Sequence, residues 1–302
     1  MARAEARALH DRLAVMFVLG DRIGHYEVTR EVAPAVYEGT HRVLPRRALI
    51  KVARGGAHGV ALLREACLLE ALQAAGVPKL YEAGQLADRG GSSDRLPWFA
   101  MELVGGESLA TVLARGTLRA AEVVKLAAGL AEILELAHRR GIIHRGLRPD
   151  RIAIAARRIC IADWSDARAH DAMHDAVDDR ADVFSLGAIA YQALTGALPT
   201  PSLYVPAATR CKNAPIELTR LIDQMLAHDR FDRPSAGEVR AELAWLASVL
   251  ETAPGEHVVL VDTDGVPEAP PVRLRKPRWT PPVSYVASDL ADLVSGEIEV
   301  KP

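Results

Sequence analysis

Two neighbouring stretches of the sequence carry residues whose types and spacing could do chemistry. The first, residues 143–152, places one imidazole and several guanidinium groups directly after an apolar approach. The second reaches an acid, Asp163, through apolar residues. A guanidinium can hold a carboxylate through two parallel hydrogen bonds. We therefore predict that Arg151 and Asp163 are salt-bridged or close, with Arg151 supplying positive charge beside the acid.

A lysine and a glutamate further upstream form a second candidate pair. Residues 48–52 are typical of a buried strand and contain Lys51, whereas residues 58–74 have helical periodicity and contain Glu65. Taken alone, a lysine and a glutamate are more often exposed surface charges. Paired with each other, they would couple the helix to the sheet.

Two histidines four residues apart form a third candidate site. His170 and His174 could share one helical face and bind a metal. The alternative is a solvated turn, which we favour because two ligands in an exposed loop do not make a closed site.

Composition limits the class of protein. The chain has 302 residues, of which 49% are hydrophobic, so we expect a sizeable core in one large or two modest domains. A net charge of −2 gives no electrostatic reason to expect nucleic acid or an anionic membrane as a partner. The longest charge-free apolar run near the N-terminus, residues 13–20, is far below the ~20 residues of a membrane span. Three widely separated cysteines favour a reducing compartment, and we expect a cytoplasmic protein.

The elements that must position these residues change in character along the chain. Alternating apolar residues begin at residue 23 and predict strands, with a further hairpin ending at 98–104. Gly105 and Gly106 then interrupt the sheet. A long amphipathic helix over 120–140 and a helix from Asp182 onward indicate a helical second part.

Together these features resemble the bacterial serine/threonine protein kinase family. Residues 144–151 resemble its H-R-D-L-K-P-x-N loop, Asp163-Trp164-Ser165 its D-F-G turn, and 48–51 its V-A-I-K strand, in the expected order over roughly residues 22–250. The resemblance implies an α+β, two-lobed protein kinase-like fold, with a small antiparallel-sheet N-lobe that carries helix C and a mainly helical C-lobe. The boundaries that we expect are an N-terminal extension at 1–21, the N-lobe at 22–104, the C-lobe at 105–250 and a proline-rich tail at 251–302.

The resemblance also implies a nucleotide pocket. Lys51 and Glu65 match the ion pair that orients phosphates, Met101 matches the back of the adenine pocket, and the backbone of Glu102 and Val104 would face the base. Asp163 matches a magnesium-binding acid. Within the C-lobe, the resemblance implies that Asp182 accepts backbone hydrogen bonds from the loop around His144 and that Trp164 packs with it.

Several positions depart from the family pattern. Gly146 stands at the place of the base aspartate, Arg148 at that of the lysine, and Arg151 at that of the metal-binding asparagine. Residues 31–37 contain no glycine and hold Pro34, so a phosphate cradle is not expected. The short segment between Asp163 and Asp182 has no A-P-E motif, which removes the usual glutamate partner of Arg233.

From these departures we predict that the chain is not an enzyme but a pseudokinase that acts as a protein-binding scaffold or regulator. Partners would include proteins that dock on the terminal extensions. No catalytic residue, cofactor or metal is expected. The two exceptions are weak ATP binding and, if magnesium binds, its contact with Asp163. Two alternatives stay open: an atypical kinase-fold enzyme, for example a nucleotidyl transferase, and an ATP-sensing switch, both using Lys51, Glu65 and Asp163.

Overall fold

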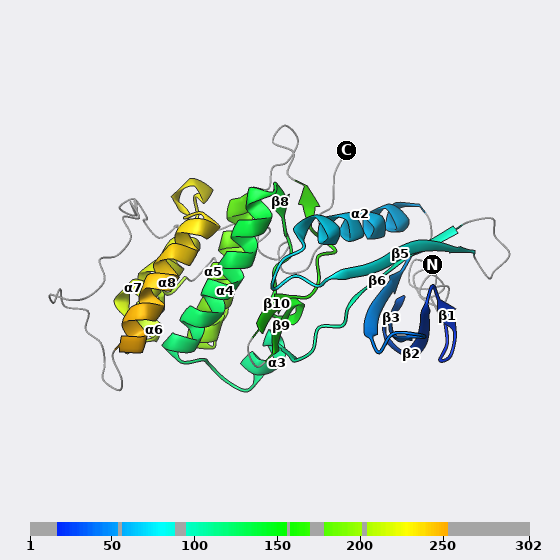
Figure 1. Ribbon diagram of the computed structural model, residues 1–302. Helices are drawn as coiled ribbons and strands as arrows, with labels where there is room; N and C mark the ends of the chain where they lie inside the picture. The colour runs from blue at the N-terminus through cyan, green and yellow to red at the C-terminus, as the bar shows by residue number, and fades with distance from the viewer. Residues whose placement is uncertain are drawn as a thin grey trace, which may run out of the picture. The chain divides into compact units, whose positions relative to one another are not determined.

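The computed structural model describes residues 17–53, 56–87, 95–155, 158–169, 178–200 and 204–252. The chain divides into two compact units, residues 1–105 and 106–302. The first is built mainly of strands and the second mainly of helices (Figure 1). The predicted α+β, two-lobed protein kinase-like fold is confirmed.

A six-stranded antiparallel sheet forms the first unit, in the order β1-β2-β3-β4-β6-β5. Its side chains alternate between the two faces, so that β4 buries Ala48, Ile50 and Val52. Tyr26 and Trp98 belong to the same apolar cluster. The strands are β1 (Arg22–Ile23), β2 (Tyr26–Ala33), β3 (Val36–His41), β4 (Arg47–Val52), β5 (Leu80–Ala87) and β6 (Arg95–Glu102).

One helix, α2 (Ala57–Leu72), packs on β5 and β6 (Figure 1). It agrees with the helix that periodicity predicts over 58–74. The helix buries Leu62, Leu69 and Leu72 on the face that also carries Glu65. A carboxylate on an apolar helix face requires a charged or hydrogen-bonding partner.

A tight hairpin stands where a glycine-rich phosphate loop would lie. Ala33 pairs with Val36, so only Pro34 and Ala35 connect β2 to β3. Ala35 has a φ of 60°, which is unusual for a residue with a Cβ, and its carbonyl accepts a 3.0 Å hydrogen bond from the Val52 amide. This turn offers few amides to a phosphate.

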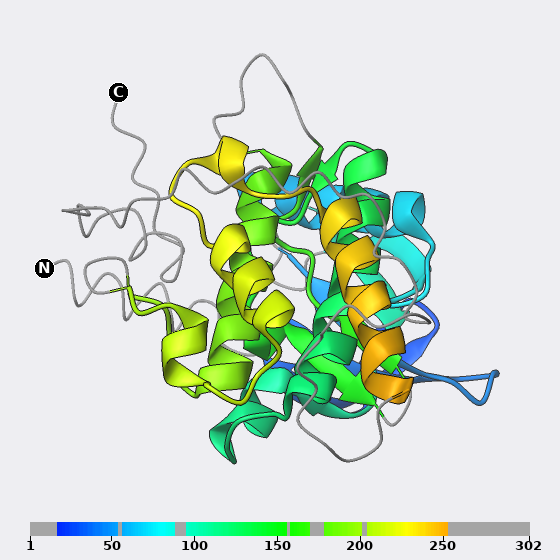
Figure 2. The ribbon, with the colours of Figure 1, turned by 90° about the vertical axis from the view of Figure 1, so that its left-hand side faces the viewer.

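Helices α4 and α8 run side by side in the second unit, and α5 packs against α4 and α7 (Figure 2). Two small sheets, β10-β9-β7 and β11-β8, are formed by short strands outside the helices. In the chain, β7 precedes α3, and the other four strands come between α4 and α5. The helices are α3 (Leu109–Ala114), α4 (Ala120–Arg139), α5 (Asp179–Thr195), α6 (Ala207–Arg210), α7 (Ile216–Met225) and α8 (Ala236–Thr252), with 3-10 turns η1 (Pro149–Arg151) and η3 (Arg230–Asp232). The strands are β7 (Glu107–Ser108), β8 (Ile142–Ile143), β9 (Ile152–Ala155), β10 (Arg158–Ile161) and β11 (Arg168–Ala169).

The junction at Gly106 depends on glycine. Its φ of 103° lies outside the range of ordinary residues, and a Cβ there would lie 2.7 Å from the carbonyl carbon of Ile154. The chain therefore passes directly against β9 as it enters the second unit.

Some predictions concern residues outside the described part of the chain. The histidine pair, His170 and His174, lies there, as do most of the N-terminal extension and nearly all of the tail. Phe17, from the end of that extension, is described and packs edge-on against Tyr37 at 5.7 Å between ring centroids.

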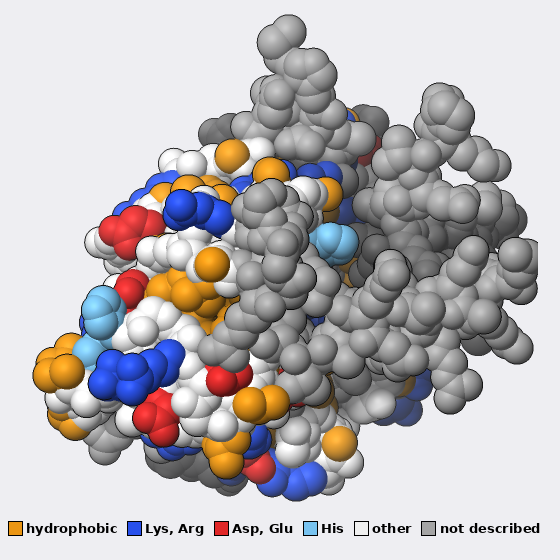
Figure 3. Space-filling view, turned by 90° about the vertical axis from the view of Figure 1, so that its right-hand side faces the viewer, with side chains coloured by type: hydrophobic (Ala, Val, Ile, Leu, Met, Phe, Trp, Pro, Cys, Tyr) orange, Lys and Arg blue, Asp and Glu red, His pale blue; other side chains and the backbone are white. Residues whose placement is uncertain are grey.

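The described surface mixes charges of both signs. Figure 3 shows lysine, arginine and acidic side chains interspersed with small apolar groups on one face. Of the helices described, none has both the length and the apolar character needed to cross a membrane.

Candidate functional site

Asp182 holds the loop that follows β8. This fully buried residue of α5 accepts hydrogen bonds from the backbone amides of His144 and Arg145, each at 2.8 Å. The Nε2 atom of His138 also lies 2.9 Å from its carboxylate. Arg145 has a φ of 65°, and its bonded amide stabilises that strained backbone. The predicted role of Asp182 is confirmed.

His144 connects this loop to Asp163. The Gly146 amide donates to its Nδ1 at 3.3 Å, so Nε2 carries the proton and donates to the Asp163 carbonyl at 2.9 Å. Burial lowers the pKa of His144, because the charged ring would lose its hydration. The imidazole is therefore neutral and acts as a structural link.

Trp164 packs in the predicted position. Its ring meets His144 edge-on at 4.8 Å, and its Nε1 donates to the Ile161 carbonyl at 2.8 Å. The side chain is fully buried. The turn that carries Asp163 is thereby fixed by packing and by hydrogen bonds.

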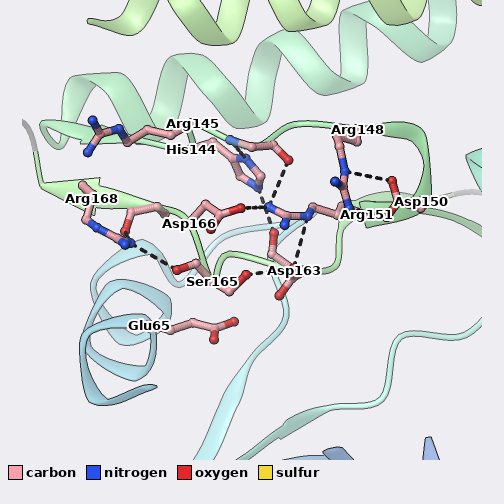
Figure 4. A network of polar contacts seen from close by, with 12 residues as sticks. Glu65, His144, Arg145, Arg148, Asp150, Arg151, Asp163, Ser165, Asp166 and Arg168 are labelled. Atoms are coloured by element: carbon pink, nitrogen blue, oxygen red, sulfur yellow. Dashed lines mark hydrogen bonds and ion pairs between the residues drawn. The ribbon is translucent and has the colours of Figure 1, made fainter. Parts of the chain in front are cut away.

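Arg151 lies between two carboxylates (Figure 4). Its Nε is 3.3 Å from Oδ2 of Asp163, which confirms the predicted contact. Its Nη1 pairs with Oδ2 of Asp166 and donates to the Gly146 carbonyl at 3.1 Å. One guanidinium thus joins the loop, the acid at 163 and a second acid.

These residues do not fit a magnesium ion at Asp163. Magnesium requires several oxygen ligands in octahedral geometry. Here Oδ2 of Asp163 already faces Arg151 and accepts a 3.0 Å hydrogen bond from Ser165, while Arg151 places a positive charge beside it. Among the described residues, no group of three or more His, Cys, Asp or Glu side chains could hold a metal.

Asp166 occupies the space that a side chain at position 146 would need. A Cβ added to Gly146 would lie 2.6 Å from Oδ2 of Asp166 and would also meet Arg151. Sequence reasoning missed Asp166. The available signal was an acid three positions after Asp163, together with a glycine at 146 that leaves room for it.

Arg148 does not join this cluster. It forms an exposed pair with Asp150, with Nη2 and Oδ2 2.8 Å apart. Figure 4 shows its side chain directed toward Asp150. The three departures from the family pattern therefore have different local roles.

Lys51 and Glu65 form the predicted ion pair within the first unit. Nζ and Oε1 are 2.7 Å apart, and the exposed fractions of the two side chains are only 13% and 3%. Glu65 thus has the partner that its burial requires. The sequence context, rather than the residue types, made this pair predictable.

Met101 and Glu102, which are predicted to contact adenine, are the last two residues of β6, and Val104 follows the strand. Met101 is buried, and the Glu102 amide donates to the Lys79 carbonyl at 2.8 Å. The Val104 amide makes no hydrogen bond to any other described residue. A nucleotide pocket would need residues of both units, so that assignment stays a prediction.

Sequence comparison gives three representative relatives. The chain is 27% identical over 239 residues to the serine/threonine-protein kinase PknB of Mycobacterium leprae, covering 67% of this chain and 38% of that protein. It is 29% identical over 239 residues to Pkn1 of Myxococcus xanthus, with coverages of 66% and 34%. It is 28% identical over 163 residues to the probable PknB of Bifidobacterium longum, with coverages of 45% and 24%.

The chain is a relative of the bacterial serine/threonine-protein kinases. It spans between 24% and 38% of the length of the three relatives described. No protein-family model matches it. The similarity to these relatives over 163 to 239 residues supports the family resemblance that the motifs indicate.

These relatives contradict the prediction that the chain is not an enzyme, because each is named as a kinase. That prediction compared Gly146, Arg148 and Arg151 with the family pattern position by position. Such a comparison misses a carboxylate that reaches the same place from elsewhere in the chain, as Asp166 does. A changed residue at 146 therefore does not establish that catalysis is lost.

Proposed function

We propose that the chain is an ATP-dependent phosphotransferase with an altered catalytic loop. The observation that carries this proposal is the buried ion pair between Lys51 and Glu65, with 2.7 Å between Nζ and Oε1. In the protein kinases, the corresponding pair must be in place for phosphate to be oriented. Glu65 fixes the ammonium of Lys51, which is a compact charge suited to phosphate oxygens.

The end of β6 supplies the proposed contacts to the base. Met101 is buried and would close the back of the adenine site. The Val104 amide, which makes no hydrogen bond among the described residues, would donate to a ring nitrogen, and the Glu102 carbonyl would accept from an amino group. Backbone contacts of this kind do not depend on side-chain type.

Arg151 would supply charge in the second unit. Catalysis of phosphoryl transfer consists almost entirely of positioning and electrostatic stabilisation. The guanidinium beside Asp163 lies where the family places a metal ligand, and it provides fixed positive charge there. We propose that Arg151 performs part of the work that a cation performs in other kinases.

The proposed acceptor is a serine or threonine hydroxyl of a protein. This proposal follows the names of the relatives, which are serine/threonine-protein kinases. A protein partner is therefore proposed as substrate. Docking through the terminal extensions stays a prediction, because it concerns residues outside the described part of the chain.

Label transfer from ATP tests this function. The full chain is incubated with γ-labelled or α-labelled ATP and a general protein acceptor such as casein, in magnesium, in manganese and in EDTA. We expect the γ label on serine or threonine, and none with Lys51→Met. Transfer of the α label would replace this proposal with nucleotidyl transfer.

Thermal unfolding with ATP separates the remaining outcomes. ATP at 100 times its dissociation constant should stabilise the fold by ~2.7 kcal/mol. Stabilisation without any label transfer would favour the ATP-sensing switch. Absence of both at millimolar ATP would overturn the proposal.

A further inference from the structure

The loop at Gly146 lacks a side chain, and the guanidinium of Arg151 and the carboxylate of Asp166 fill the gap. Oδ2 of Asp166 lies 2.6 Å from the position of a Cβ on Gly146, and the Asp166 Cβ lies 3.2 Å from it. An aspartate at 146 would extend its own carboxyl group from that Cβ. The structure therefore places a carboxylate beside the loop position where the family carries one.

The backbone on both sides of Asp166 is fixed. Trp164 is fully buried, and its carbonyl accepts a 3.0 Å hydrogen bond from the amide of the buried Ala167. Directly beyond, β11 pairs with β8, with Arg168 opposite Ile143. The segment that carries Asp166 is thus attached to the strand that leads into the loop.

Arg151 fixes the side chain of Asp166. The guanidinium pairs with Oδ2 of Asp166 and also donates to the Gly146 carbonyl at 3.1 Å (Figure 4). Its own side chain is only 15% exposed, so it has few alternative positions. The carboxylate is therefore held relative to the loop itself and not only relative to its own turn.

One oxygen of Asp166 is available to a substrate. Its contact with Arg151 uses Oδ2, and Oδ1 has no hydrogen-bond or ion-pair partner among the described residues. The side chain is 51% exposed, so a solute can reach it. A carboxylate fixed through one oxygen and accessible through the other suits the alignment of a hydroxyl group.

Two nearby acids are poorer candidates for this role. The carboxylate of Asp150 is engaged in its exposed pair with Arg148 (Figure 4). Oδ2 of Asp163 faces both Arg151 and Ser165, and its carbonyl accepts from His144. Of the three acids, Asp166 supplies two of the three atoms nearest to a Cβ at position 146.

We propose that Asp166 is the catalytic carboxylate that aligns the acceptor hydroxyl, in place of the missing aspartate at 146; this inference rests on the proposed phosphotransferase function. The acceptor oxygen forms a bond to the γ-phosphorus of a nucleoside triphosphate. The bond from that phosphorus to the β,γ-bridging oxygen breaks, and its electron pair leaves with the nucleoside diphosphate. The hydroxyl proton passes to Oδ1 of Asp166 and then to water.

The test compares four forms of the full chain in the γ-label assay with casein: wild type, Asp166→Asn, Asp150→Asn and the exchange Gly146→Asp/Asp166→Gly. The Asp150 change is the matched control, because it removes an exposed carboxylate from the same loop. We expect Asp166→Asn to lower kcat by a factor of ~100 or more, with the KM for ATP unchanged. Asp150→Asn should stay within about twofold of wild type, as expected for an exposed ion pair. The kcat of the exchange variant should be at least about tenfold higher than that of Asp166→Asn.

A pH profile adds a second measurement. A carboxylate that accepts the proton gives kcat/KM an acidic limb, which Asp166→Asn should abolish. An active wild type with an equally active Asp166→Asn would overturn the role of Asp166 and leave the proposed function standing. An inactive wild type that transfers no label would overturn both. If Asp166→Asn unfolds, the exchange variant decides: recovered activity supports the proposal, and a folded, inactive exchange variant in which ATP still raises the melting temperature contradicts it.

Discussion

Arg151 lies within salt-bridge distance of Asp163, with 3.3 Å between Nε and Oδ2. The family pattern places an asparagine at position 151, where it would share a metal ion with the acid. In this chain the two side chains contact each other directly, and the same guanidinium holds Asp166. Positive charge at the site is therefore part of the polypeptide.

Replacing Arg151 with methionine should destabilise the fold. Methionine keeps much of the aliphatic volume but leaves two neighbouring carboxylates without their shared cation. Because the guanidinium is largely buried, we expect a loss of about 1.5–3 kcal/mol, in the range for hydrogen bonds to charged groups. Urea unfolding at neutral pH measures it. Arg148→Met removes an exposed pair and should cost under about 1 kcal/mol; equal losses in the two variants would contradict this assignment.

The Lys51–Glu65 pair should be strongly non-additive. Lys51→Met removes the cation that lies 2.7 Å from the almost fully buried Glu65, and we expect a loss of about 3–5 kcal/mol. Replacing both residues with methionine also removes the buried carboxylate, so the double variant should be more stable than Lys51→Met alone. Denaturant unfolding of the four forms of this cycle gives the coupling energy.

The same cycle separates structure from function. The double variant should fold and yet lose the stabilisation that ATP gives the wild type, because the ammonium that would contact phosphate is absent. If the double variant is as unstable as Lys51→Met, the burial of Glu65 is not the cause of the loss. If ATP still stabilises it fully, Lys51 is not a phosphate ligand.

The pairs that sequence reasoning predicted share a physical basis. The apolar pattern of a strand, a helix or a loop determines which of its positions face the core. Lys51 and Glu65 occupy such positions, and so do Asp182 and the loop at His144. When the strand, the helix and the loop pack together, these polar groups become buried. Burial then requires that they meet.

The role of Asp166 could not be predicted in this way. It lies in a turn whose path depends on the burial of Trp164 and on the pairing of β11 with β8. A glycine at 146 indicates free space but not which side chain enters it. The contact between position 146 and Asp166 exists only in three dimensions.

Arg233 shows the same limit for backbone partners. The sequence predicts that it loses a glutamate partner. The structure shows its guanidinium donating to the carbonyls of Ala227, His228 and Arg180, and stacking over Phe184 at 4.7 Å. Every residue has a carbonyl, so residue types do not reveal which carbonyls converge.

Asp182→Asn should be among the most destabilising single changes in the second unit. The carboxylate accepts two backbone amides and faces His138 with both oxygens engaged. An asparagine has one acceptor oxygen, so at least one buried amide loses its partner, and we expect a loss of about 2–4 kcal/mol. Urea unfolding measures the loss, with Asp150→Asn as an exposed control. A change below about 0.5 kcal/mol, the size typical of surface substitutions, would show that the amides find other partners.

His144 should make the fold less stable at mildly acidic pH. Burial lowers its pKa in the folded protein below the ordinary value of 6.5, so the unfolded chain binds the proton first. Above about pH 6.5 both states are neutral and the residue contributes no pH dependence. As the pH falls below that value, the unfolded state gains a proton that the folded state excludes. Stability should then fall by up to about 1.4 kcal/mol per pH unit, until the folded pKa is reached.

Urea unfolding at pH 7.5 and 5.5 measures this dependence. His144→Gln removes the titrating group while retaining polar atoms near Gly146 and the Asp163 carbonyl, so its overall stability drops but its loss between the two pH values should be smaller than that of the wild type. The loss of stability between the two pH values should be about 1 kcal/mol larger for the wild type than for His144→Gln, because the unfolded wild type takes up one additional proton over this interval. Carboxylates titrate mainly below pH 5 and affect both forms alike. Identical pH dependence in the two proteins would show that folding does not lower the pKa of His144, and the burial argument would be wrong.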